Sequence, residues 1–275
     1  MNEVGIGRRR ARALGAITRR DWQLMRSYPL QIVTQFGRAL IAVAAIATSA
    51  RLVRNAPEMQ QYGGDYFPYV LIGLSILVLV TVSLNTFSRR ILEEQNLGTL
   101  EVVLASPIGL GTFLIGSLVI PMARATLIVV GYFVVAYLVF DVQLPFDGLL
   151  VAIPVSLLTV LAFGAIGVLS ASFVLLTKRG DPIAIIAAQA ATFLGGAIFP
   201  IALLPAWLRW SAVFFPSYWS IEALRQAMLG DDGPAGAVVP SMVLAAFALG
   251  LVVTSTLVFQ ATMRLCRRLG TLGVH

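Results

Sequence analysis

Six long apolar runs, separated by segments with charged or turn-forming residues, constrain this sequence more than any other feature. A helix needs about 20 apolar residues to cross the roughly 30 Å hydrocarbon core of a bilayer. The runs span residues 30–53, 66–87, 108–140, 149–176, 183–204 and 237–263. They lack the two-residue alternation of membrane barrel strands, and unpaired backbone groups are costly in lipid. We therefore expect an all-α integral membrane protein with six transmembrane helices.

The composition supports this fold class. Hydrophobic residues make up 58% of the chain and charged residues 12%, whereas about a quarter of the residues in soluble domains are charged. We expect one transmembrane domain over residues 1–275, with a cytoplasmic segment 1–29, a membrane region 30–263 and a cytoplasmic tail 264–275. The single cysteine, Cys266, excludes a disulfide within the chain, and we expect no metal site.

The run 108–140 is longer than one simple crossing requires. Its 33 residues would extend about 50 Å as a helix. Two crossings of about 16 residues each would lack a polar turn between them. Pro121 and Arg124 interrupt the run near its middle, so we expect one tilted, kinked helix whose start projects into the cytoplasm.

The basic residues set the expected orientation. With both termini in the cytoplasm, the cytoplasmic segments carry fourteen basic residues, and the outer segments carry four, Arg51, Arg54, Arg209 and Arg225. This distribution follows the positive-inside rule. The basic residues flank apolar runs, so the net charge of +7 does not indicate nucleic-acid binding. We expect a multi-pass protein of the cell inner (plasma) membrane. Lys178 is the only lysine, beside many arginines, and this ratio indicates a bacterial genome of high GC content.

The segment 1–29 has the pattern of an amphipathic helix. Its apolar face carries Leu14, Ile17 and Leu24, and its basic face carries Arg12 and Arg19. Such a helix lies at the interface and binds anionic lipid headgroups. It could anchor the topology, or it could act as an elbow that clasps the first span of a partner subunit.

The most informative polar segment is 88–107, between the second and third runs. Gly98 is expected to break a helix, Thr99 to cap a second short helix, and Pro107 to end it. Two short helices would then project below the membrane. A loop that only joined two spans could be much shorter, so the segment predicts a docking surface for another protein.

Parts of this segment resemble a known family. Glu94, Gly98-Thr99-Leu100-Glu101 and Leu104-Ala105-Ser106-Pro107 are similar to the signature of type-2 ABC exporter permeases, which include drug, O-antigen, teichoic acid and lipid-linked glycan exporters. A second similarity, to the external half-helices of that family, lies in 204–208, Pro216 and 222–225. One departure is Asn96, where many relatives carry a second acidic residue.

The resemblance implies a permease subunit that forms the translocation pathway as a dimer, with a second copy of this chain or a close relative, and with two copies of an ABC ATPase subunit. The implied ATPase-coupling residues are Arg89, Arg90, Glu93, Glu94, Gly98, Thr99, Leu100 and Glu101. Lys178 and Arg179 would form a second cytoplasmic contact, unless their loop serves only topology. The sequence has no phosphate-binding Gly-x-x-x-x-Gly-Lys-Ser/Thr motif, so ATP and Mg²⁺ are expected in the partner, with no cofactor in this chain.

Arg124 is the most informative single residue, because it is a charged residue near the middle of an apolar run. None of the six runs contains Asp or Glu, so the arginine has no acidic partner within them. A charge at the bilayer centre costs about 2.5–3.5 kcal/mol on insertion scales, and it normally faces protein or water. Arg124 either bonds carbonyls, such as those freed by Pro121, or lines the pathway and meets an anionic group of the substrate.

The outer segment between the last two runs is rich in aromatic residues, a composition typical of the membrane–water interface. The resemblance implies instead two short re-entrant helices that close the pathway from outside. The expected external-gate residues are Pro205, Trp207, Trp210, Pro216, Tyr218, Trp219, Glu222 and Arg225. Glu222 and Arg225, three residues apart, could pair on the second helix.

Three other functions are compared with the exporter function on the basis of the residues within the apolar runs. A membrane enzyme would need reacting groups, and the sequence has no intramembrane carboxylate, His-Glu-x-x-His or Gly-x-Ser-x-Gly. An ion-coupled secondary transporter normally buries carboxylates or histidine in the membrane. A non-transporting membrane subunit that relays ATPase motion is the third alternative. We expect an exporter subunit with an amphipathic substrate: a lipid-linked glycan, a drug or antibiotic, or a lipid.

Overall fold

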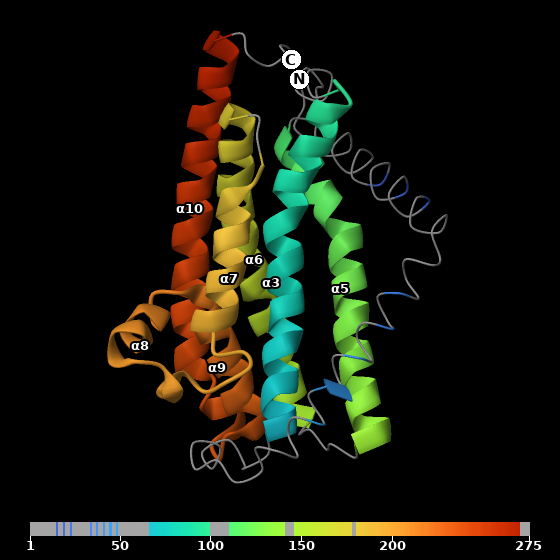
Figure 1. Cartoon of the computed structure of the whole chain (residues 1–275), viewed down its shortest axis with the longest axis vertical. Coiled ribbons are helices and arrows are strands. Elements are labelled where there is room, and N and C mark those ends of the chain that lie inside the picture. The colour runs from blue at the N-terminus through green and yellow to red at the C-terminus, as the bar shows by residue number, and fades with distance from the viewer. Residues whose placement is uncertain are drawn as a thin grey trace, which may run out of the picture.

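The computed structural model describes residues 66–99, 110–140, 146–177 and 180–269, with isolated positions between 15 and 48. Within these ranges the chain is helical, without strands (Figure 1). The elements are α3 (Tyr66–Asn96), α5 (Leu110–Phe140), α6 (Phe146–Thr177), α7 (Pro182–Leu194), η2 (Ile201–Leu203), α8 (Ala206–Ala212), α9 (Pro216–Leu229), η3 (Gly233–Ala235) and α10 (Val238–Leu269). The predicted all-α fold is confirmed for these residues. The predicted amphipathic helix and the first apolar run lie outside them.

Four of the described helices are long and apolar enough to cross a membrane: Tyr66–Asn96, Gly116–Leu138, Asp147–Thr177 and Gly233–Cys266. The fifth predicted run, 183–204, is not one long helix. Its helix, α7, has 13 residues and ends at Leu194, so it covers only about 20 Å. Gly196 then takes a positive φ of 63°, and Pro200 precedes the short helix η2. The count of six spans remains a prediction.

The long third run forms one helix, as predicted. α5 is continuous over 31 residues, with Pro121 inside it. A proline removes one backbone donor and disturbs the preceding turn, but helices embedded in a membrane tolerate this because other groups satisfy the freed carbonyl. The alternative of two separate crossings is wrong.

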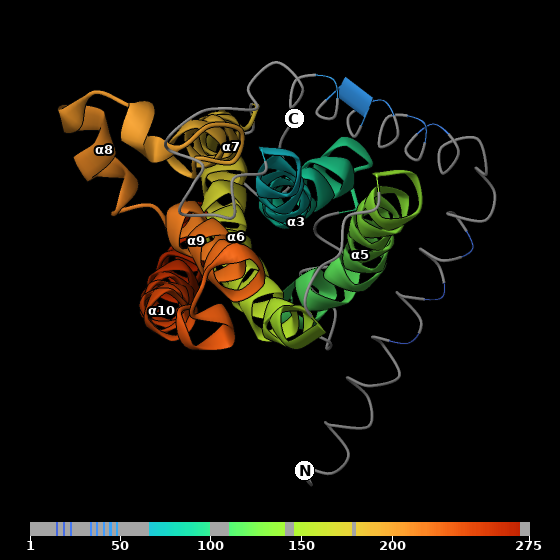
Figure 2. The ribbon, with the colours of Figure 1, turned by 90° about the horizontal axis from the view of Figure 1, so that it is seen from below.

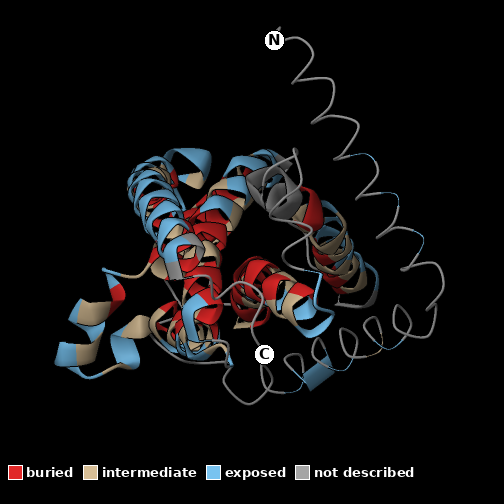
Figure 3. Ribbon diagram, turned by 90° about the horizontal axis from the view of Figure 1, so that it is seen from above, coloured by how far each residue is buried: buried red, intermediate tan, exposed pale blue. Residues whose placement is uncertain are grey.

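Helix α3 is the central element of the bundle. It packs against α5, α6, α7 and α9, and the view along the bundle places it between α5 and α7 (Figure 2). In the most apolar part of α3, 72% of the residues are buried, whereas 17% are buried in the most apolar parts of α5 and α10. The outer faces of the bundle are correspondingly exposed (Figure 3). Their apolar side chains therefore suit a lipid surface.

A small-residue contact brings α6 close to α3. A Cβ added at Gly167 would lie 2.8 Å from the carbonyl oxygens of both Ser83 and Leu84. Glycine at this position lets the two backbones approach, as small residues do in membrane helix pairs. Ile76 and Phe163 lie in the same buried core.

The two ends of the bundle carry the candidate sites. In Figure 1, α3, α6 and α10 end at the top, whereas α8 and α9 lie at the bottom. The described ends of α3, α6 and α10, which are predicted to be cytoplasmic, therefore share one end, and α8 and α9, which are predicted to be external, lie at the other.

Candidate functional site

The end of α3 that is predicted to be cytoplasmic is a continuous extension of the helix. We expected the second span to end near Phe87 and a separate short helix to follow, and this is wrong, because α3 continues to Asn96. No glycine or proline stands between Phe87 and Gly98, so nothing breaks the helix. The polar turns thus extend rigidly from the buried helix.

Gly98 ends α3, as predicted. Its φ is +66°, a value that glycine adopts at little cost. The Gly98 amide donates to the Gln95 carbonyl at 3.0 Å, and the Thr99 amide donates to the Glu94 carbonyl at 3.0 Å. These two bonds define a Schellman motif, which satisfies the last carbonyls of a helix and turns the chain away from its axis.

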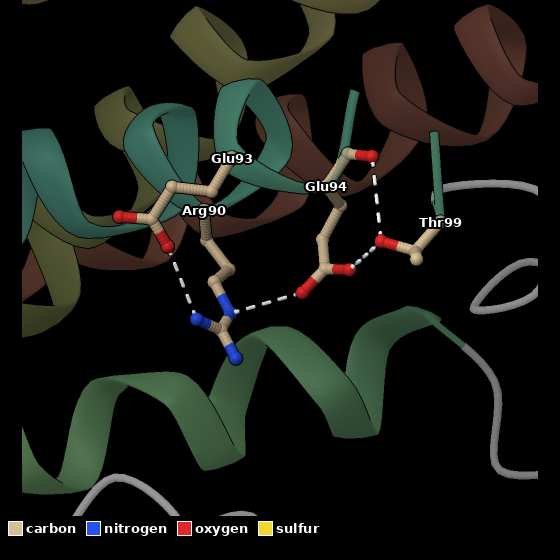
Figure 4. Close-up of polar contacts among 4 residues, drawn as sticks. All are labelled: Arg90, Glu93, Glu94 and Thr99. Carbon is tan, nitrogen blue, oxygen red and sulfur yellow. Dashed lines mark hydrogen bonds and ion pairs between the residues drawn. The ribbon is translucent and has the colours of Figure 1, made fainter. Parts of the chain in front are cut away.

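Four side chains form a polar cluster at this end (Figure 4). Arg90 Nη1 donates to Glu93 Oε2 at 3.1 Å, and Arg90 Nε lies 3.7 Å from Glu94 Oε1. The Thr99 hydroxyl donates to Glu94 Oε2 at 2.5 Å. The guanidinium is directed toward α5 (Figure 4). The cluster connects the last turns of α3 to Thr99, the third residue after the helix.

The predicted coupling residues divide into an exposed and a buried group. Arg89 is exposed, and the Glu93 side chain is 60% exposed. The Glu94 side chain is 8% exposed, and Arg90 is half-buried beside it. Only the first group presents charge to a partner. Leu100, Glu101, Lys178, Arg179 and the predicted second helix lie outside the described residues.

Asp181 fixes the start of α7 at the same end of the bundle. It accepts a hydrogen bond from the Ala184 amide at 2.9 Å and caps the helix, as expected of aspartate in this position. The Ser170 hydroxyl of α6 also donates to it. The sequence signal for this cap was the Asp-Pro pair before an apolar helix.

Arg124 lies on α5, at the border between the side that packs on α3 and the exposed side. Its flanking residues, Ala123 and Ala125, are exposed and buried, respectively. Its Nη2 atom is buried and has no hydrogen-bond partner among the described residues. The expected alternative, in which carbonyls freed by Pro121 satisfy this nitrogen, is not seen in the described part.

At the opposite end, two short helices follow the chain out of α7. Pro205 precedes α8, and Pro216 is the first residue of α9, so both prolines stand where helices start. Trp207 and Trp210 on α8 are 74% and 75% exposed. α8 lies to the side of the bundle (Figures 1 and 2). The predicted gate aromatics on α8 are therefore at the surface of the single chain.

Helix α9 lies deeper than α8 and packs into the bundle. Tyr218 and Trp219 are half-buried, and their rings meet edge to face with centroids 5.0 Å apart. Burial, and secondarily Glu222, raises the pKa of Tyr218, so its hydroxyl stays protonated at neutral pH. Glu222 accepts a hydrogen bond from Gln226 at 2.8 Å.

Arg225 is buried inside the bundle, with 2% of its surface exposed. Its Nη2 donates to the carbonyls of Tyr69 and Ala197, both at 3.1 Å, and its Cζ lies 3.3 Å from the centroid of the Tyr69 ring. We expected an external arginine that could pair with Glu222, and we missed these contacts. The signal was the helical period, because Ile221 and Met228 share its face.

The same arginine joins three segments around the turn after α7. A Cβ added at Gly73 of α3 would lie 2.2 Å from the Ala197 carbonyl oxygen, so α3 and the turn are in close contact. The Tyr66 hydroxyl donates to the Ile198 carbonyl at 2.9 Å. Arg209 of α8 donates to the Ala202 carbonyl at 3.0 Å. Side chains from three helices thus satisfy the carbonyls of this irregular segment.

The family comparison agrees with the architecture of the chain. The family model described as ABC-2 type transporter matches residues 12–229, which is most of the 275 residues and includes both ends of α3, Arg124 and the two short helices. No curated protein matches the chain. Proteins of this family typically work with an ATPase partner. The chain therefore belongs to the ABC-2 type transporter family and is a multi-pass membrane permease subunit of an ABC transporter.

Proposed function

We propose that the chain is the permease subunit of an ATP-driven exporter, in which two copies form the translocation pathway and two ATPase subunits dock below them. The observation that carries the proposal is the charged end of α3. Arg89 and Glu93 are exposed there, on a rigid extension of the most buried helix. A force applied to this end reaches the centre of the membrane domain through continuous helix.

ATP hydrolysis belongs to the partner in this proposal. The sequence lacks a phosphate-binding loop, so ATP and Mg²⁺ bind the ATPase subunit, and this chain carries no catalytic residue. Leu100, Glu101, Lys178 and Arg179 complete the docking surface. The substrate is amphipathic: a lipid-linked glycan, a drug or antibiotic, or a lipid.

The membrane arrangement is part of the same proposal. Six spans place both termini in the cytoplasm of a bacterial cell, with the chain in the inner membrane and segment 1–29 as an interface helix. The helices α8 and α9 are re-entrant and close the pathway from outside. Pro205, Trp207 and Trp210 belong to the outer part of this gate, and Pro216, Tyr218, Trp219, Glu222 and Arg225 belong to its inner part.

Arg124 supplies a positive charge to the pathway. Its Nη2 has no hydrogen-bond partner among the described residues, and no acidic residue lies in the six apolar runs. An anionic group of the substrate would complete its bonding. For R124Q we expect export to fall at least tenfold while the melting temperature stays within about 3 °C of wild type, a shift equivalent to roughly 1 kcal/mol. Unchanged export by R124Q would remove Arg124 from the pathway.

The docking proposal is tested with the chain and its ATPase subunit co-expressed and reconstituted in nanodiscs. Charge reversal at both exposed residues, R89E with E93K, should weaken ATPase binding by tenfold or more, measured by surface plasmon resonance. The matched control is the reversal D231K, at an exposed residue of the opposite end of the bundle. Equal binding by wild type and the double variant would contradict the docking site.

The same complex, reconstituted in sealed proteoliposomes, separates the alternatives. A pump exports substrate into vesicles only when ATP is hydrolysed. An ion-coupled secondary transporter would work without the ATPase and would respond to an ion gradient. A non-transporting relay subunit would bind the ATPase and change shape on hydrolysis, yet move no substrate.

A further inference from the structure

We infer that Glu94 is a positioning residue, which fixes the direction in which the chain leaves α3 at Thr99, and that it is not a contact residue for the ATPase. The residues that follow Thr99, 100–107, are called the docking segment below. The inference rests on the proposed function, because it assigns a role within ATPase coupling. It separates two adjacent glutamates that have the same chemistry and different surroundings.

The first support is the difference in exposure between these neighbours. Glu93 has 60% of its side chain exposed, whereas Glu94 has 8%. Both oxygens of Glu94 face groups of this chain: Oε1 faces Arg90 Nε at 3.7 Å, and Oε2 accepts from the Thr99 hydroxyl at 2.5 Å. A partner protein would find little of this carboxylate to bind.

The second support is the backbone motif that Glu94 completes. In a Schellman motif the residue three positions before the cap and the second residue after it usually share a hydrophobic contact. Here these residues are Glu94 and Thr99, and they share a short hydrogen bond to a carboxylate. The Thr99 amide also donates to the Glu94 carbonyl. Main chain and side chain therefore hold the same two residues together.

The third support is the position of Thr99 in the chain. It directly precedes Leu100 and Glu101, the remaining predicted coupling residues. Hydrogen bonds to ionised groups are shorter and stronger than neutral ones, and the low exposure of Glu94 limits competition from water. A rotation imposed on the docking segment is thus passed to α3 and is not absorbed by the turn.

The test uses the full complex in nanodiscs, with a fluorophore on the outer side. Cys266 is the only cysteine and is buried, so a C266S background allows single labelling at D231C. The signal is the change in fluorescence when vanadate traps the ATPase after one turnover. The variants are T99V, which keeps the shape of the side chain and removes the hydroxyl, T99S, which keeps the hydroxyl, and E94Q.

We expect T99V to reduce the vanadate-dependent signal about tenfold, while its affinity for the ATPase stays within twofold of wild type. T99S should restore the signal. E94Q combined with T99V should lose no more signal than T99V alone, because both act on one contact.

The neighbouring variant E93Q is the matched control. It should weaken ATPase binding and leave the signal per bound ATPase unchanged, the opposite of T99V. A T99V variant that loses ATPase binding, or one that keeps the full signal, would overturn the inference. If wild type itself binds no ATPase, the proposed function fails, and this outcome is distinct from either result for T99V.

Discussion

The two ends of α3 are both held by an arginine, but with different partners. At the end predicted to be cytoplasmic, Arg90 pairs with the carboxylates of Glu93 and Glu94. At the other end, Arg225 binds backbone carbonyls and lies over an aromatic ring. Carboxylate pairs respond to charge, salt and neighbouring proteins, whereas carbonyl partners carry no titratable charge. Arg225 is also only 2% exposed, whereas Glu93 has 60% of its side chain exposed, so the first end is suited to receiving a signal and the second to staying in place.

The largest effect should come from removing the buried arginine. R225L leaves two carbonyls without their charged donor and leaves the Tyr69 ring without the cation, so we expect a loss of about 3 kcal/mol. Scanning fluorimetry of the purified protein should show a melting temperature lower by several degrees. R209Q is the control, because Arg209 binds its carbonyl in an exposed setting. Equal shifts for the two variants would mean that Arg225 is not the anchor of this end.

A methyl group at the closest approach should have the next largest effect. In G73A the new Cβ would meet the Ala197 carbonyl oxygen at 2.2 Å, and overpacking of this kind costs about 1–3 kcal/mol. The melting temperature should fall. G250A is a matched control, because a Cβ there meets nothing within 4 Å. A tolerated G73A would show that the turn after α7 can move away from α3.

Substitution of Gly98 in the Schellman turn should lower the stability less than the substitutions of Arg225 and Gly73 at the other end of α3. Gly98 has a positive φ, and an added Cβ meets no atom within 4 Å, so G98A suffers backbone strain alone, about 1–2 kcal/mol. Asparagine adopts this conformation more readily, and G98N should recover part of the loss in melting temperature. The same loss for both substitutions would contradict the assignment of strain to φ.

The smallest effect on stability should come from the exposed carboxylate. E93Q removes an ion pair three residues apart on a helix surface, worth about 0.2–0.5 kcal/mol and weakened by salt. We expect a melting temperature within about 1 °C of wild type, with a measurable loss of ATPase affinity. A large change in stability would show that the end of α3 with Glu93 contributes as much to stability as the end that Arg225 holds.

The sequence predicted most of the fold because membrane insertion leaves a strong pattern. The apolar runs predicted the all-α class and the single long helix α5, and the glycine at position 98 predicted the end of α3. The shortness of α7 was missed, because hydropathy counts apolar residues and does not register that Gly196 and Pro200 redirect the chain. The extension of α3 past Phe87 was missed because polarity was taken for a helix end, although no residue there breaks a helix.

Among the candidate site residues, the sequence identified which segments are polar but not which side chains are buried. Glu93 and Glu94 are adjacent and differ only in the side of the helix to which they point. From the sequence alone, both were equally good candidates for a contact with the ATPase. Arg225 was expected on the outer side of the membrane as a gate residue, and the sequence did not show that its side chain is buried between helices. Such differences depend on contacts between residues far apart in the sequence, such as Tyr69 and Arg225, which no local pattern encodes.

The irregular segment after α7 has a consequence for hydration. Peptide carbonyls outside a helix normally attract water, and a bilayer interior provides none. Here the hydroxyl of Tyr66 and the guanidinium groups of Arg209 and Arg225 take the place of that water. Three carbonyls of the segment are therefore satisfied without water, so the segment needs fewer contacts with solvent than an irregular chain segment otherwise would.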